Sequence, residues 1–141
     1  MQTLTEIDCH SFLERFQHFD DAVLRAVEVV YPYAWFTRPP PPEPERKRLN
    51  LLVSGVDREA DNGWCNVVLQ LDDVQQWKID EPHAGYHGVL SDGLKIRWFD
   101  GIVYLDFSTD VYDLGTPEAF RRTRRYAAAM RLTWHVQPYD R

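Results

Sequence analysis

The chain has 141 residues, of which 44% are hydrophobic and 27% are charged, and its formal net charge is −6. These proportions are typical of one globular domain with its own core, so we expect a single domain over residues 1–141. No apolar run is long enough to cross a membrane and the first residues do not follow a signal-peptide pattern, so we expect no membrane association.

An apolar stripe near the start of the chain predicts a short amphipathic helix. Phe12, Leu13, Phe16 and Phe19 recur at a spacing that places them on one helical face, which we expect to pack against a sheet. The next segment, 22–31, is rich in β-branched and apolar residues and predicts the first strand.

Four consecutive prolines, Pro39–Pro42, place a long loop over residues 32–47, because proline has no N–H to donate within a sheet. An Asn62-Gly63 pair further along predicts a tight turn. Three strands are predicted around this turn, at about 48–57, around Val67, Leu69 and Leu71, and at about 74–80.

Residues 94–107 carry the strongest signal in the chain. Asp100-Gly101 predicts a two-residue hairpin turn, since glycine adopts positive φ without steric cost. Folding the segment there places Ile96 opposite Leu105 and Trp98 opposite Val103 on one apolar face. The other face then pairs Lys95 with Asp106 and Arg97 with Tyr104, and Leu94 lies opposite Phe107.

A second turn at Asp92-Gly93 predicts that 86–91 also folds back, with Val89 opposite Ile96 and His87 opposite Trp98, to give a three-strand meander. In the last segment, Thr116-Pro117-Glu118 predicts a helix start. That helix either ends near Arg124 or continues through Ala127–Ala129; we expect about two turns and then a final strand with Leu132, Trp134 and Val136 on one face.

These elements predict an α+β fold. We expect one domain built on a mainly antiparallel sheet of about six or seven strands, bent or partly closed, with one or two helices.

No motif for catalysis or cofactor binding is found. The five histidines lack metal-ligand spacing, and neither a nucleophile elbow nor a phosphate-binding loop is present, so we expect no enzyme activity, metal or cofactor. Cys9 and Cys65 do not make a disulfide framework, and we expect both to be buried or half-buried free thiols of a cytoplasmic protein.

Charge is unevenly distributed. Residues 1–115 carry 20 acids against 10 lysines and arginines, whereas 116–141 carry six arginines against two acids. The arginine cluster at 121–125 has the residue types of a nucleic-acid site, but the acidic chain as a whole argues against one, and pairing with acids of the same chain or of a partner is the simpler interpretation.

We therefore expect a non-enzymatic protein-binding module whose partner has a basic surface, while its oligomeric state stays open. Exposed aromatics beside acids are typical of protein-binding surfaces. The candidate partner contacts are Tyr33, Trp35, Asp57, Glu59 and Asp61. The alternative is a small-molecule binder or small enzyme with a site in the concave sheet face, formed by His87, His135, Tyr104 or Arg97.

Both ends of the chain resemble a loose group of small bacterial α+β proteins. The segment from Phe19 to Val27 is similar to their Phe-His-Asp opening, with Asp20 where the group has His, and the stretch from Leu132 to Pro138 is similar to their final strand. Some members resemble immunity proteins, which bind and block a bacterial toxin, so the resemblance implies a partner of that class.

Overall fold

The computed structural model describes residues 1–31, 47–61, 63–80, 88–108 and 113–139. Its elements in chain order are β1 (Gln2–Thr3), α1 (Cys9–Arg15), the 3₁₀ turn η1 (Gln17–Phe19), β2 (Ala22–Val30), β3 (Arg48–Val56), β4 (Trp64–Ile79), β5 (Val89–Leu90), β6 (Lys95–Phe99), β7 (Ile102–Asp106), α2 (Pro117–Arg121) and β8 (Arg125–Pro138).

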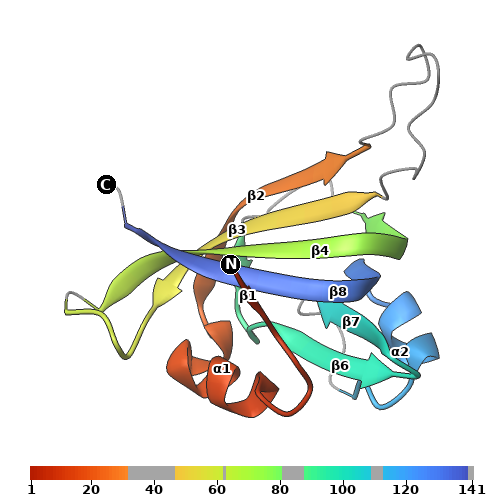
Figure 1. The fold of residues 1–141 in the computed structure, drawn as a ribbon, viewed down its shortest axis with the longest axis horizontal. Helices are drawn as coiled ribbons and strands as arrows, with labels where there is room; N and C mark the ends of the chain where they lie inside the picture. Colours follow the sequence, from red (N-terminus) through yellow and green to blue (C-terminus); the bar gives the residue numbers. More distant parts are fainter. Residues whose placement is uncertain (32–46, 62, 81–87, 109–112, 140–141) are drawn as a thin grey trace.

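The strands form one antiparallel sheet in the order β5-β2-β3-β4-β8-β7-β6, and β1 adds to β8. The sheet curls into a half-barrel, with α1 on its lower side and α2 beside β7 (Figure 1). The bent antiparallel sheet is thus confirmed. The two described helices span only seven and five residues, however, so the fold is mainly β rather than α+β.

The β6–β7 hairpin has the predicted register. Ile96 pairs with Leu105, Trp98 with Val103 and Lys95 with Asp106. Asp100 and Gly101 both have positive φ, 50° and 77°, as a type I′ turn requires. The alternation of apolar residues was sufficient to set this register, because a one-residue slip would expose the core face.

The predicted meander is wrong at β5. Val89 pairs with Val23 of β2, not with Ile96, and His87 lies outside the described residues. Gly93 does turn the chain, with φ 74°, but its backbone packs against the His18 carbonyl so closely that a Cβ would collide with it. The Leu94 N–H donates to that same carbonyl at 3.0 Å, so η1 separates β5 from β6.

The predicted third and fourth strands form the single 16-residue strand β4. A register shift against β8 between Val74 and Gln76, next to Asp73 with φ 55°, marks a bulge inside it. Bulges bend a strand and increase its twist without ending it, and here the bulge lies where the sequence alternation breaks.

The C-terminal helix is shorter than predicted. Thr116 caps it by accepting a hydrogen bond from the Ala119 N–H at 3.2 Å, and the helix ends at Arg121. Ala127–Ala129 belong to β8 despite their helical propensity. All three pair with both β4 and β7, and all three are buried.

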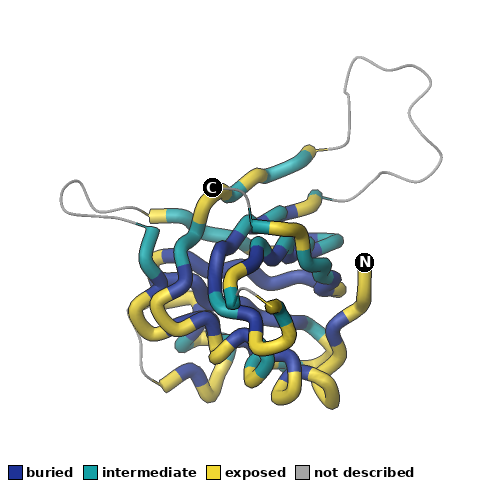
Figure 2. The backbone as a smooth tube through the Cα atoms, turned by 90° about the vertical axis from the view of Figure 1, so that its left-hand side faces the viewer, coloured by how far each residue is buried: buried dark blue, intermediate teal, exposed yellow. Residues whose placement is uncertain are grey.

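The main core fills the concave side of the sheet. Phe12 and Phe16 come from α1 and the residue that follows it, and Phe19 comes from the left-handed turn η1 rather than from a continued helix. A smaller cluster on the convex side includes Tyr104, Phe120 and Tyr126 and lies beneath α2, so both faces of β7 are buried. Figure 2 shows the buried positions in the middle of the molecule and the exposed ones at its turns and ends.

Candidate functional site

The acidic turn between β3 and β4 is the region where the sequence predicts partner contacts. Backbone hydrogen bonds close this turn: the Asp57 N–H donates to the Gly63 carbonyl at 3.0 Å, and the Gly63 N–H donates to the Ala60 carbonyl at 3.2 Å. Glu59 and Asp61 are exposed on it. The turn therefore presents two acids on a backbone held by its own hydrogen bonds.

Asp57 has a different role, because its side chain is only 3% exposed. Arg15 donates from Nε to Oδ1 at 2.9 Å and from Nη2 to Oδ2 at 3.0 Å, and the Glu59 N–H donates to Oδ1 at 2.9 Å. The hydrogen bonds from Arg15 hold the pKa of Asp57 below its ordinary value. The structure thus corrects the prediction for Asp57, which is a structural acid that joins the turn to α1.

Arg15 is the residue of this region that the sequence did not single out. Its guanidinium lies 5.0 Å from the ring centroid of Phe16 and 5.5 Å from that of Trp134, and Nη1 is 3.0 Å from Oε2 of Glu59. The hydrogen bonds to Asp57 raise the pKa of Arg15 above its ordinary value. One guanidinium therefore joins α1, the turn and β8.

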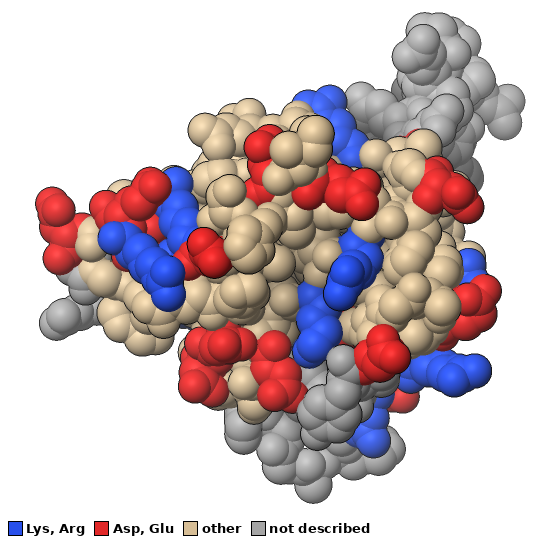
Figure 3. Space-filling view, turned by 90° about the horizontal axis from the view of Figure 1, so that it is seen from below, with Lys and Arg blue, Asp and Glu red and all other residues tan. Residues whose placement is uncertain are grey.

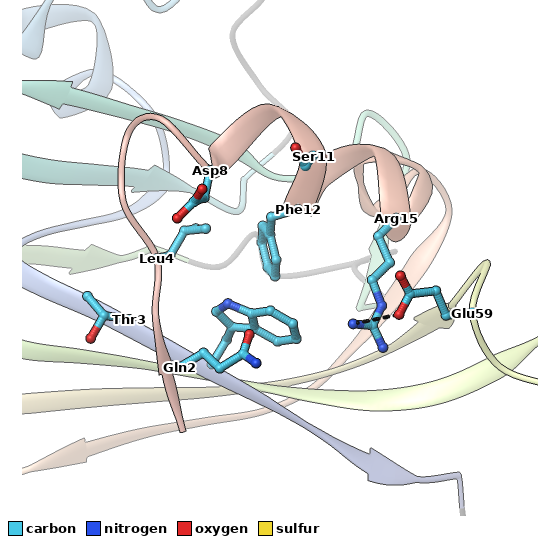
Figure 4. A pocket seen from close by; sticks show the side chains of 9 residues that line it. Gln2, Thr3, Leu4, Asp8, Ser11, Phe12, Arg15 and Glu59 are labelled. Carbon is cyan, nitrogen blue, oxygen red and sulfur yellow. Dashed lines mark ion pairs between the residues drawn. The ribbon is translucent and has the colours of Figure 1, made fainter.

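A hollow of about 240 Å³ opens beside this ion pair (Figure 4). The rings of Phe12 and Trp134, whose centroids are 5.0 Å apart, form its aromatic side. Asp8 and Glu59 lie on either side of Phe12 in this view. The other lining residues are Gln2, Thr3, Leu4, Ser11 and Arg15. Aromatic faces between two carboxylates suit a cationic side chain, and Arg15 already contributes one against Trp134 and Glu59.

Trp64 is the second residue that sequence reasoning missed. It begins β4 directly after the acidic turn, is 42% exposed, and its ring centroid lies 6.0 Å from that of Tyr139. The alternation of side chains along a strand predicts its exposure. Cys65, Val67 and Leu69 point into the core, so Trp64 must point away from it.

Tyr33 and Trp35 lie outside the described residues. Tyr31, the last described residue before them, is exposed, and Nζ of Lys47 lies 5.1 Å from its ring centroid. Lys47 directly precedes β3, and Val30, which precedes Tyr31, pairs with Arg48, so both residues lie at the opposite end of β3 from the acidic turn (Figure 1). The C-terminal end of β2 therefore does not approach Glu59 and Asp61.

The residues named for a concave small-molecule site are not brought together. Arg97 and Tyr104 are cross-strand neighbours on the convex face, and Tyr104 is buried against Phe120 with ring centroids 5.4 Å apart. His135 lines a separate hollow of about 350 Å³ that includes Met1, and His87 lies outside the described residues.

The arginine cluster is divided by burial: Arg121, Arg122 and Arg124 are exposed, whereas Arg125 is buried. Arg121 lies 3.5 Å from Glu118 and donates to Gln76 at 3.1 Å, while Arg125 is buried with its guanidinium 5.5 Å from the Phe107 ring centroid. Internal pairing was the simpler interpretation of these residues, and it holds for Arg121.

Both cysteines are free and buried. Burial raises the pKa of Cys9 and of Cys65 to about 11, so each thiol is protonated at neutral pH and is a poor nucleophile. Within the described ranges, no three His, Cys, Asp or Glu side chains come together as a metal site. Nor does any helix in those ranges have the length and apolar character needed to cross a membrane.

No protein-family model matches the chain, and no curated protein or solved structure is significantly similar to it.

Proposed function

We propose that this chain is a non-enzymatic protein-binding module that binds a basic partner through its acidic turn. The observation that carries the proposal is the exposed Trp64 next to the exposed acids Glu59 and Asp61, on a turn that Arg15 and Asp57 tie to α1. We call Glu59, Asp61 and Trp64 the tip surface; of these, Glu59 also lines the hollow on the α1 side of the turn.

The tip surface has the chemistry of a binding hot spot. Tryptophan contributes more to interfaces than most residues because it buries a large area with few rotatable bonds. A turn already held by hydrogen bonds loses little conformational entropy on binding. The hollow on the α1 side of the turn, where Asp8 and Glu59 flank the Phe12 and Trp134 rings, would receive a lysine or arginine of the partner that shares Glu59 with Arg15.

The net charge of −6 supports a basic partner, because opposite charge accelerates encounter at low ionic strength. The resemblance at both ends of the chain suggests an immunity protein that blocks a basic toxin surface, and we keep this as the specific form of the proposal. Two free cysteines support a cytoplasmic location.

The test is capture of a partner from the source cell, followed by measurement of its association rate across ionic strength. We expect the double variant Glu59→Lys/Asp61→Lys to slow association and flatten its salt dependence, and Trp64→Ala to speed dissociation. Asp80→Lys/Asp92→Lys is the matched control, since both are exposed acids outside the tip surface. Failure to capture any protein, or a complex that ignores the tip variants, would remove the proposal.

A further inference from the structure

A second surface lies on the opposite side of α1, along the outer edge of β6. Among the strands that the structure describes, β6 pairs only with β7, so its other edge presents backbone N–H and carbonyl groups that no described strand uses. Such an edge is a template for another extended chain.

A groove of about 580 Å³ follows this edge. Every residue from 94 to 99 lines it, and Leu13 and His10 of α1 line its other side. Successive side chains of a strand point to opposite faces, so a hollow that touches six in a row must run along the edge itself. The groove therefore has the shape for an extended segment.

The strand along the groove is cationic. Lys95 and Arg97 alternate with Ile96 and Trp98, and β6 contains no acid. Figure 3, which views the molecule from below, shows basic side chains near its middle and both basic and acidic ones toward its margins. Glu6 and Asp113 also line the groove, so the positive charge is confined to the strand.

Lys95 supplies a second, independent observation. Its Nζ is buried from solvent and has no hydrogen-bond partner in the described part of the chain, although Asp106 lies opposite Lys95 on β7. A buried ammonium that donates no hydrogen bond is costly, and a carboxylate that accepts one would reduce that cost.

We propose that an extended acidic segment of another protein pairs with the β6 edge. Its acidic side chains, at every second position, face Lys95 and Arg97, and its apolar side chains enter the groove against Leu13. A second copy of this chain fits poorly, because antiparallel pairing centred on Ile96 or on Arg97 places one cation opposite another. This surface is separate from the tip surface and does not depend on it.

The probe is a synthetic peptide of alternating glutamate and valine, with an alternating lysine and valine peptide as its control. We expect the glutamate peptide to shift the backbone amide resonances of residues 95–99 and slow their hydrogen exchange, and the lysine peptide to do neither. A central valine-to-proline change in the glutamate peptide should abolish these effects, since proline cannot donate to a strand ladder.

A charge swap identifies the contact. Arg97→Glu should weaken the glutamate peptide about tenfold and allow the lysine peptide to bind, whereas Arg122→Glu, at an exposed arginine outside the groove, should change neither. The tip variant Glu59→Lys/Asp61→Lys should bind the glutamate peptide as the unmodified chain does.

The proposal is overturned if the glutamate peptide does not bind, if Arg97→Glu leaves its affinity unchanged, or if sedimentation shows that the β6 edge joins two copies of the chain. Loss of peptide binding in the tip variant would also overturn it, because the site would then not lie at β6. None of these results bears on partner capture through the tip surface.

Discussion

The positive charges on the two sides of α1 have different surroundings. On one side, Arg15 reaches two carboxylates and two aromatic rings, so its charge is matched within the chain. On the other side, Nζ of Lys95 is buried and donates no hydrogen bond within the described residues, although Asp106 lies opposite it on β7. A matched charge contributes to folding, whereas an unmatched one costs stability and gains it back only when a partner supplies the opposite charge.

Detaching α1 should abolish the difference between the two sides most completely, because the helix separates them. Phe16 is 1% exposed and its ring centroid lies within 5.2 to 5.7 Å of the rings of Phe12, Phe19 and Trp134. We expect Phe16→Ala to lower the free energy of unfolding by about 3–5 kcal/mol, measured by urea denaturation. Leu13→Ala, at a half-buried position, should cost clearly less; equal losses would mean that Phe16 is not the anchor.

On the matched side, Asp57→Asn should lower the free energy of unfolding by about 2 kcal/mol, because it leaves Arg15 without its bidentate acceptor. The pKa of Asp57 is lower in the folded protein than in the unfolded chain, so its charged form stabilises the fold above about pH 4. That stabilisation is lost as pH falls through the folded pKa.

The difference between the unmodified chain and Asp57→Asn should therefore be full at neutral pH and should shrink in acid, as urea denaturation across pH would show. Asp61→Asn is the control, since Asp61 is an exposed acid of the same turn. A difference that stayed constant into strong acid would contradict the role of the Asp57 charge.

On the unmatched side, Lys95→Met should raise the free energy of unfolding by about 1 kcal/mol, because it removes a buried ammonium and keeps the aliphatic chain. Lys78→Met is the matched control: Nζ of Lys78 donates to the Arg121 carbonyl at 2.7 Å and lies 5.7 Å from the Tyr126 ring centroid, so its loss should destabilise. Thermal melts of the two variants should shift in opposite directions. A melting temperature lowered by Lys95→Met would show that this charge is matched after all.

The sequence predicted local pairing well where alternation and a turn agreed. The register of β6 and β7 follows from Asp100-Gly101 and the apolar residues on either side, since both constraints select one pairing. The same reasoning failed at Gly93, because the turn there packs on the His18 carbonyl, and no local pattern records a contact with a segment 75 residues earlier.

The site was predicted only in part, for a similar reason. Exposure of Glu59 and Asp61 follows from their place in a turn, but the burial of Asp57 depends on Arg15, which is 42 residues away. Nothing local distinguishes Asp57 from the acids beside it. The exposure of Trp64, in contrast, could have been predicted from strand alternation, since its neighbour Cys65 points inward.

The smallest effect tests whether the tip surface is free to bind. Glu59 also approaches Arg15, but its side chain is 67% exposed, and exposed ion pairs contribute about 0–1 kcal/mol. We expect Glu59→Gln to change the free energy of unfolding by less than about 0.5 kcal/mol in urea denaturation, with the difference vanishing at high salt. If Glu59→Gln cost as much as Asp57→Asn, both carboxylates would be committed to holding α1, and the acid offered to a basic partner would fall to Asp61 alone. A small change in the free energy of unfolding would mean that Asp57 alone holds Arg15 and that Glu59 can bind the partner. The burial of Asp57 and the exposure of Glu59 predict this outcome.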